Sequence, residues 1–203
     1  KWKNKGFYPQ DVILKRKDPL EKNFLSIYKI YQEKLVNLNS ADFSDLILHT
    51  LKIFEKYTDI AELYSKKFKY ILVDEYQDTN FIQSEWLRHL SGHNKNICCV
   101  GDDDQSIYSW RGAEIKNFLE FDKVYENTKV IRLEKNYRST QNILSVASKL
   151  IENNQNRVGK TLFTNHDDGE LVSLSCFRNV KDEATEVGAE IERLKKDFSL
   201  NEV

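Results

Sequence analysis

Methionine is absent from the 203-residue chain, and glycine and proline are scarce, with seven and two residues. This scarcity excludes a low-complexity linker and favours continuous helices and strands. No apolar run approaches the roughly 18 residues that a membrane helix needs. The N-terminal stretch KWKNKGFYPQ lacks the apolar core of a signal peptide. We therefore expect a cytoplasmic protein that does not cross a membrane.

Cysteine is also scarce, and two of the three cysteines, Cys98 and Cys99, are adjacent. An adjacent pair does not form a disulfide framework, so the sequence predicts reduced thiols, with these two in a buried strand. The four histidines show no metal-ligand spacing: His49, His89, His93 and His166.

The net charge of −1 provides no global basic field that would attract nucleic acid. Basic residues are nevertheless concentrated in residues 1–22. They are Lys1, Lys3, Lys5, Lys15, Arg16, Lys17 and Lys22. The charge pattern alone favours a solvated face.

Apolar residues at helical spacing predict helices over residues 20–38 and 43–57, and the first 66 residues as a whole have a helical pattern. Residues 139–152 also have a helical pattern, with Ser139 as a candidate N-cap. Residues 182–198 predict a further helix.

The pattern changes after residue 66, where short β-branched or apolar runs alternate with helical segments. Predicted strands cover residues 70–74, 96–102 and 129–134, with helices over 80–90 and 114–121 between them. This alternation is typical of a parallel sheet buried on both faces. A further segment, LVSLSCF at 171–177, alternates like a strand.

The stretch YILVDEYQDTN, residues 70–80, places Asp74, Glu75 and Asp78 directly after an apolar run. Ligands of open α/β sheets bind at the carboxyl ends of the strands. An apolar strand followed by Asp-Glu has the form of a Walker B strand, in which Asp74 holds Mg²⁺ and Glu75 orients and deprotonates the attacking water. The alternative is a solvated turn in which Asp78 or Thr79 caps the next helix.

A second segment, VGDDDQSIYSWRGA at 100–113, follows the next predicted strand. Gln105 is an uncharged donor and acceptor that can contact a γ-phosphate. Tyr108 and Trp110 lie beside Arg111, and aromatic faces next to a cation suit single-stranded bases. The alternative is that Trp110 packs into the core.

A third segment, LEKNYRST at 133–140, again follows a predicted strand. Tyr137 can stack on a base or a ribose, and Arg138 can contact a phosphate through two hydrogen bonds. The alternative for Arg138 is a surface ion pair at the start of a helix.

Together these segments resemble the UvrD/Rep family of superfamily 1 ATP-dependent DNA helicases. DEYQDTN is similar to the family's motif II, VGDDDQSIYSWRGA to motif III and LEKNYRS to motif IV. ADFSDLI at 41–47 resembles a Leu-Asp-Phe-x-Asp-Leu segment of the family, with Ala41 in place of Leu. NRVGKTLFT at 156–164 resembles the stretch after motif IV.

The resemblance implies a catalytic role for Glu75, Gln105 and Arg138, with Mg²⁺ at Asp74. It implies that Tyr137 stacks on the ATP base, while Gln105 and Arg138 contact the γ-phosphate. Single-stranded DNA then contacts Tyr108, Trp110 and Arg111, and the basic N-terminal stretch contacts DNA phosphates in a salt-dependent way.

The resemblance also implies an α/β fold of the P-loop NTPase (RecA-like) type with a parallel sheet, preceded by a helical subdomain. Residues 1–40 correspond to the end of an inserted helical (1B-like) subdomain. Residues 41–130 correspond to the later part of the first RecA-like domain, and residues 131–203 to the start of the second. The implied activity is ATP-driven translocation on single-stranded DNA and unwinding of duplex DNA, with 3′ to 5′ polarity in most of the family.

The segment VGKT, residues 158–161, resembles the end of a Walker A motif, G-x-x-x-x-G-K-[ST]. The motif needs a glycine five residues before Gly159, and this position is Asn154, so the sequence contains no Walker A motif. The segment also follows a predicted helix, and a P-loop follows a strand. The sequence therefore predicts an ordinary loop here. Together with the missing methionine, it predicts an internal piece of a longer helicase that hydrolyses ATP poorly by itself.

Two alternatives remain open on the sequence. One is a piece of a helicase-nuclease of the AddA or RecB type, whose nuclease domain lies outside these residues. The other is a non-catalytic remnant that binds DNA or a partner without turnover.

Overall fold

The computed structural model describes residues 1–14, 18–155 and 157–199. These residues form two compact units, which are described separately. The first unit comprises residues 1–132 and 154–159, and the second comprises residues 133–153 and 160–203.

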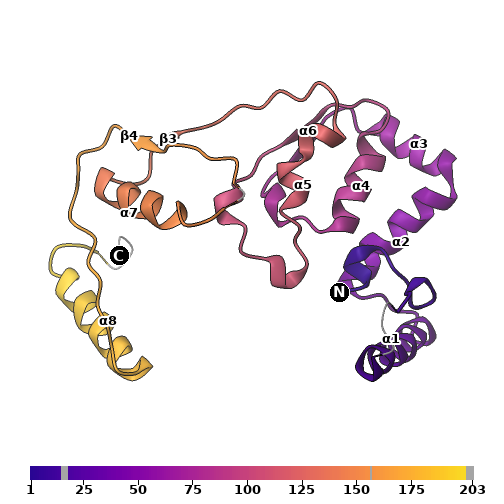
Figure 1. Ribbon diagram of the computed structural model, residues 1–203, viewed down its shortest axis with the longest axis horizontal. Coiled ribbons are helices and arrows are strands. Elements are labelled where there is room, and N and C mark those ends of the chain that lie inside the picture. Colours follow the sequence, from indigo (N-terminus) through magenta and orange to yellow (C-terminus); the bar gives the residue numbers. More distant parts are fainter. Residues whose placement is uncertain (15–17, 156, 200–203) are drawn as a thin grey trace. The chain divides into compact units, whose positions relative to one another are not determined.

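The first unit consists of helices followed by a small α/β region. Its helices are α1 (Pro19–Asn37), α2 (Phe43–Lys56), α3 (Thr58–Lys67), α4 (Phe81–Ser91), α5 (Lys116–Leu119) and α6 (Phe121–Val124), and its strands are β1 (Ile71–Val73) and β2 (Ile97–Cys99). Its single-turn 3₁₀ helices are η1 (Lys3–Lys5), η2 (Pro9–Asp11), η3 (Tyr76–Asp78), η4 (Asp103–Gln105) and η5 (Ser109–Arg111). In Figure 1, α4 lies between the α2–α3 pair and the α5–α6 segment.

The second unit contains β3 (Lys135–Asn136), α7 (Gln141–Ile151), β4 (Phe163–Thr164) and α8 (Val180–Leu194). Strands β3 and β4 pair in parallel, with Lys135 opposite Phe163. Helix α7 packs beside β4. The predicted helices over 139–152 and 182–198 are therefore confirmed, although the second ends at Leu194.

The core of the first unit forms where α2 meets α4. Leu48 and Leu51 of α2 pack with Ile82 of α4, and all three side chains are at most 2% exposed. The helical spacing of α2 directs these leucines to one face. Tyr8 and Ile47 pack against the cluster.

Strands β1 and β2 pair in parallel, with Ile71 opposite Ile97 and Val73 opposite Cys99. The predicted α/β alternation and parallel pairing are confirmed. The predicted burial on both faces is wrong, because Leu72 is 80% exposed and Cys98 is exposed. Cys98 and Cys99 therefore lie in a strand, but Cys98 is exposed and Cys99 is only partly buried. Burial still raises the pKa of the Cys99 thiol to about 12.

Two predicted strands do not form. Residues 129–134 are not assigned to a strand, although the carbonyl of Glu134 accepts from the N–H of Phe163 at 3.1 Å. Val130 and Ile131 are 67% and 69% exposed. Pairing starts one residue later, at Lys135. Residues 171–177 also lack a paired strand within the described chain, and Leu174 is 93% exposed. A strand needs a hydrogen-bonding neighbour, which alternation in sequence does not provide.

The helix starts depend on side-chain caps. Asp42 accepts a hydrogen bond from the N–H of Asp45 to begin α2, and Asn80 accepts one from the N–H of Gln83 to begin α4. The cap of α4 is therefore Asn80, and neither Asp78 nor Thr79 caps it.

Two further sequence predictions about helices need correction. Thr140, and not Ser139, is the N-cap residue of α7, because the N–H of Ser139 donates to Asn136 Oδ1 in the preceding turn. The single helix expected over 114–121 is split into α5 and α6 at Glu120.

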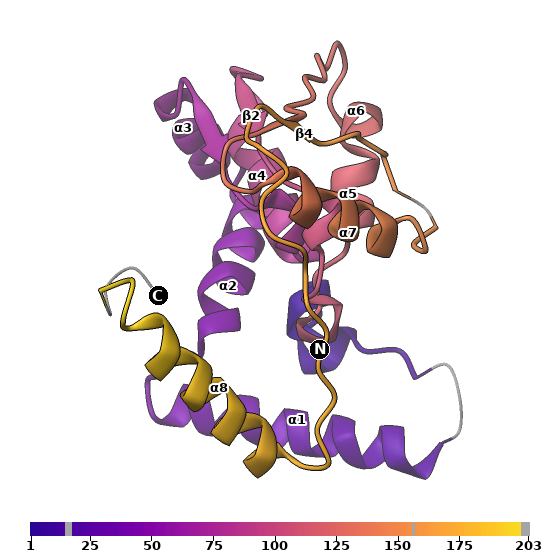
Figure 2. The ribbon, with the colours of Figure 1, turned by 90° about the vertical axis from the view of Figure 1, so that its left-hand side faces the viewer.

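The N-terminal segment is anchored to α2 by a buried ion pair. The ammonium group of Lys3 contacts Asp42 at 2.7 Å and Asp45 at 2.8 Å, and the Asp45 side chain is fully buried. Lys3 also lies 5.0 Å from the centre of the Tyr31 ring of α1. In Figure 2, α1 runs across the bottom of the view and α2 rises above it. Lys3 is thus a structural cation and is not available to DNA phosphates, which corrects that part of the basic-stretch prediction. Lys15, Arg16 and Lys17 of the same prediction lie outside the described residues.

Burial alone would raise the pKa of Asp42, but hydrogen bonds from Lys3, the N–H of Asp45 and Tyr31 outweigh it and lower the pKa. A depressed carboxyl pKa contributes stability above the unfolded-state value of about 3.9 and loses it as the pH falls through the folded-state value.

We predict that Lys3→Met lowers the free energy of unfolding at pH 7 by about 3–5 kcal/mol, because it leaves the Asp45 carboxylate buried without its cation. Urea denaturation measures the loss, and the exposed Lys5→Met serves as the matched control, with a change below about 0.5 kcal/mol. The difference between wild type and Lys3→Met should narrow as the pH falls below about 4, because the Asp42 carboxyl is protonated first in the unfolded state and, at lower pH, in the folded state. A difference that stays constant from pH 7 to pH 3 would contradict this account.

Candidate functional site

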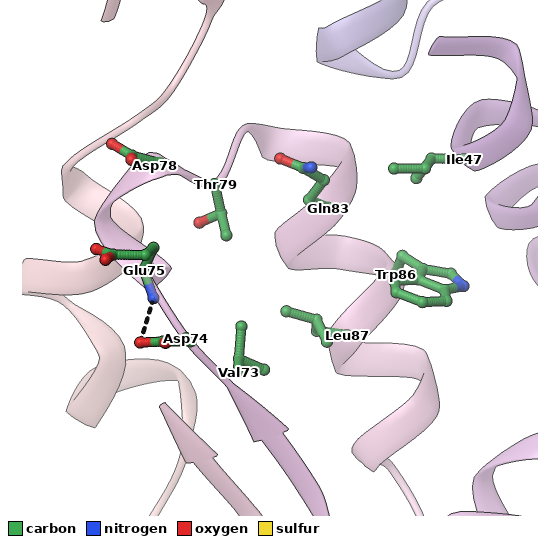
Figure 3. A pocket seen from close by; sticks show the side chains of 9 residues that line it. All are labelled: Ile47, Val73, Asp74, Glu75, Asp78, Thr79, Gln83, Trp86 and Leu87. Atoms are coloured by element: carbon green, nitrogen blue, oxygen red, sulfur yellow. Dashed lines mark hydrogen bonds between the residues drawn. The ribbon is translucent and has the colours of Figure 1, made fainter. Parts of the chain in front are cut away.

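A pocket of about 290 Å³ opens where β1 ends. Figure 3 shows Asp74, Glu75 and Asp78 on one side of it, with Gln83, Trp86 and Leu87 of α4 on the other. Val73, Thr79 and Ile47 complete the lining. The pocket therefore combines an acidic rim with an apolar wall.

The acidic rim is built by the turn between β1 and α4. Asp74 Oδ1 accepts a hydrogen bond from the N–H of Glu75 at 2.9 Å, drawn in Figure 3. Glu75 has a left-handed backbone, with φ of 50°. This conformation is unfavourable for a residue with a Cβ atom and is typical of constrained functional turns.

The rim suits a hard cation, because carboxylate oxygens are the ligands that Mg²⁺ prefers. Asp78 Oδ1 is buried and has no hydrogen-bond partner among the described atoms. No group of three or more His, Cys, Asp or Glu side chains in the described ranges is arranged to hold a metal ion. Magnesium that takes one or two carboxylates, with water and phosphate oxygens as its other ligands, does not need such a group.

The loop after β2 lies against this turn. The N–H of Tyr76 donates to the carbonyl of Val100 at 3.0 Å, and the N–H of Asp102 donates to Gln77 Oε1 at 3.0 Å. Gln105 is exposed, and its side chain donates to Asp102 Oδ2 at 2.8 Å. The parallel pairing of β1 and β2 thus brings the segment of Asp74 and Glu75 beside the segment of Gln105.

The three predicted DNA-contacting residues form one cluster. The guanidinium carbon of Arg111 lies 5.5 Å from the Tyr108 ring centre and 5.7 Å from the Trp110 ring centre. Trp110 is 79% exposed, so the alternative in which it packs into the core is wrong. Asn4 Nδ2 donates to the carbonyl of Arg111 at 3.0 Å and fixes the end of the loop.

An ion pair that the sequence did not reveal supports this loop. The guanidinium of Arg157 donates two hydrogen bonds to Asp104, at 2.8 and 2.5 Å. These hydrogen bonds raise the pKa of Arg157. The N–H of Val158 also donates to Asp103. Arg157 and Asp104 lie 53 residues apart, and no pattern in the sequence predicted their contact.

Tyr137 and Arg138 lie side by side after β3 in the second unit. Tyr137 is 74% exposed, and Lys135 Nζ lies 5.0 Å from its ring centre. Asn136 Oδ1 accepts from the N–H groups of Arg138 and Ser139, which shapes the turn.

Gly159, of the sequence VGKT, lies in a loop without a preceding strand or a following helix, so the prediction that it is not a P-loop is confirmed.

Several residues of the pocket were missed by sequence reasoning. Trp86 and Gln83 line it from α4. Gln77 is 1% exposed and donates a hydrogen bond to Glu75, which lines the pocket. The helical spacing of α4 gives no signal that separates a pocket-lining Trp86 from a core residue.

Comparison with known proteins gives two family matches. Residues 1–126 match the UvrD/REP helicase N-terminal domain, and residues 131–203 match the UvrD-like helicase C-terminal domain. These matches confirm the predicted α/β class of the P-loop NTPase type. The chain belongs to the UvrD/REP helicase family.

Curated relatives support this membership. The chain is 45% identical to a probable DNA helicase II homolog of Rickettsia conorii over 99% of its length, which is 31% of that relative. It is 49% identical to the ATP-dependent DNA helicase PcrA of Bacillus subtilis over 75% of the chain and 20% of the relative. For DNA helicase II of Escherichia coli the identity is 44%, over 90% of the chain and 25% of the relative. The chain therefore spans less than a third of the length of each of these relatives.

No helix in the described part of the chain is long and apolar enough to cross a membrane.

We predict that Gly101→Ala destabilises the first unit by about 1–3 kcal/mol. A Cβ atom at this position would lie 2.5 Å from Gln77 Oε1 and 2.8 Å from Phe118 Cε2, so the loop after β2 has to shift. Gly188→Ala in α8 is the matched control, because its Cβ would meet nothing within 4 Å. The control should be neutral or stabilising by up to about 1 kcal/mol, since alanine favours a helix interior. Equal effects of the two variants in urea denaturation would refute the steric argument.

Proposed function

We propose that this chain carries part of the motor of an ATP-dependent DNA helicase, which translocates on single-stranded DNA and unwinds duplex DNA, with 3′ to 5′ polarity. The observation that carries the proposal is the contact between the acidic turn after β1 and the loop after β2. Through Gln77 and Asp102 this contact joins Glu75 to Gln105, and the N–H of Glu75 donates to Asp74, so all of them belong to one hydrogen-bonded group. The family matches and the relatives' names support the same activity.

In this proposal Asp74 is a ligand of Mg²⁺, and Glu75 is the general base. Bound Mg²⁺ neutralises the charge of the ATP phosphates. Glu75 orients the attacking water and takes its proton, and the exposed side chain of Gln105 contacts the γ-phosphate. Tyr137 stacks on the base of ATP, and Arg138 contributes a second, cationic contact to the γ-phosphate.

The DNA contact in this proposal is the cluster of Tyr108, Trp110 and Arg111. An exposed indole beside a guanidinium offers a stacking surface to successive bases of any sequence. Because Gln105 lies three residues before Tyr108 in the same loop, a change at the γ-phosphate can reach the bases through one short segment. This arrangement couples ATP hydrolysis to movement along the strand.

The domain assignment is also proposed. Residues 1–40 form the end of an inserted helical subdomain, residues 41–130 the later part of a first RecA-like domain and residues 131–203 the start of a second. The separation into two compact units near residue 132 supports a boundary there. The proposal places the protein in the cytoplasm, together with DNA and ATP.

We predict that Glu75→Gln lowers the kcat of DNA-stimulated ATP hydrolysis at least about 100-fold in the natural gene product that carries this sequence, because the amide cannot accept a proton. Affinity for ATP and for single-stranded DNA should change by less than about threefold, since the substitution preserves shape. The exposed Glu126→Gln is the control, with wild-type kcat. Hydrolysis at the wild-type rate in Glu75→Gln would eliminate Glu75 as the base.

We predict that Trp110→Ala weakens binding of an oligo-dT strand by about 1–3 kcal/mol, because one stacking surface is lost. Arg111→Gln should instead flatten the dependence of log Kd on log salt by about 0.7, the value for one phosphate contact on a single strand. Fluorescence anisotropy at several salt concentrations separates the two effects. The control is Phe43→Ala, which removes another exposed aromatic ring, 91% exposed on α2. If Phe43→Ala weakens binding as much as Trp110→Ala, the loop is not the DNA contact.

A further inference from the structure

Gln77 is a buried amide with both ends of its side chain hydrogen-bonded. Its Nε2 donates to Glu75 Oε2 at 2.7 Å, and its Oε1 accepts from the N–H of Asp102 at 3.0 Å. A backbone N–H can only donate and a carboxylate can only accept, so only one orientation of the amide satisfies both partners. The side chain is 1% exposed, and burial prevents water from replacing either partner.

The hydrogen bonds continue beyond Asp102 to the residue proposed to contact the γ-phosphate. Asp102 Oδ2 accepts from Gln105 Nε2 at 2.8 Å, and Asp102 Oδ1 accepts from the N–H of Asp104 at 3.1 Å. A continuous series of hydrogen-bonded residues therefore joins Glu75 to Gln105 through Gln77 and Asp102. Gly101 permits this close approach, because a Cβ atom there would collide with Gln77 Oε1.

We propose that Gln77 is a positioning residue, which holds the Glu75 carboxylate in place and ties it to the loop that carries Gln105. The inference rests on the proposed function, in which Glu75 is the general base. Glu75 is exposed, and an exposed glutamate samples several rotamers unless a partner selects one. The hydrogen bond from Gln77 is charge-assisted and comes from an immobile donor, so it selects one carboxylate position.

Packing alone does not account for this amide. An apolar side chain of similar volume would fill the same space without the cost of burying two polar groups. One end of the Gln77 amide donates to the carboxylate of Glu75, which lines the pocket, whereas the other end accepts from a backbone N–H. The effect on catalysis can therefore be separated from the effect on loop anchoring by changing only one end of the amide.

Gln77→Glu makes that separation, because it keeps an acceptor for the Asp102 N–H and replaces the donor to Glu75 by a second carboxylate oxygen. In the natural gene product we expect kcat of DNA-stimulated ATP hydrolysis to fall about 10- to 100-fold, as misplacement of a catalytic group does. The KM for ATP and the affinity for single-stranded DNA should change by less than about threefold, because Glu75 acts on the attacking water and not on ATP binding. The exposed Gln10→Glu introduces the same charge change elsewhere and should keep the wild-type kcat.

A Gln77→Glu protein with kcat within about twofold of wild type would overturn the proposal. A fall in kcat matched by an equal change in the KM for ATP or in DNA affinity would also overturn it, because general disruption of the site then explains the loss.

A second experiment does not depend on catalysis. The double variant Glu75→Gln with Gln77→Glu exchanges the two groups, so residue 75 becomes the donor and residue 77 the acceptor. Thermal unfolding should show a higher midpoint for the double variant than for Gln77→Glu alone, because the hydrogen bond forms again in reverse. Additive effects of the two substitutions would refute the contact between the side chains.

The two experiments distinguish failure of the inference from failure of the proposed function. If the wild-type gene product shows no DNA-stimulated ATP hydrolysis, the proposed function is refuted. Thermal unfolding of the double variant then still tests whether the side chains of residues 75 and 77 are in contact. Wild-type hydrolysis with an unaffected Gln77→Glu refutes only the role of Gln77.

Discussion

The parallel pairing of β1 with β2 is the constraint on which the candidate site depends. It aligns Val73 with Cys99, so the acidic turn that follows one strand lies against the loop that follows the other. Parallel strands end at the same edge of a sheet, and the groups that follow them converge there. The short strands contribute few hydrogen bonds, and the contact is completed beyond them by Tyr76 with Val100 and by Gln77 with Asp102.

Buried polar groups, more than apolar area, give these loops a defined geometry. Gln77 joins the two loops of the site, as the Lys3 ion pair with Asp45 joins the N-terminal segment to α2. Each group is costly to bury and becomes favourable only when all of its partners are in place. Such contacts tolerate few alternative arrangements, which suits the proposed role of Glu75.

Sequence patterns predicted helices from local spacing, and they predicted strands correctly where a neighbouring segment pairs with them. The amphipathic spacing of α2 and α4 and the strands β1 and β2 were found, and so was the exposed aromatic segment with Trp110. The predictions at 129–134 and 171–177 failed, because a strand exists only with a neighbour to pair with. Burial of Cys98 failed for a related reason, since it depends on what covers the second face of the sheet.

The sequence by itself determined the chemical groups of the site and their order along the chain: a carboxylate pair after one strand, then a glutamine and an aromatic cluster with an arginine after the next. These follow from residue type and spacing, which are local properties. Only the tertiary structure decided that Gln77 bridges Glu75 and Asp102, that Lys3 is buried against Asp45 and that Arg157 supports Asp104. Each of these contacts depends on geometry beyond the spacing of residues, and the two ion pairs join positions more than 40 residues apart. Such contacts exist only after the strands pair and the helices pack.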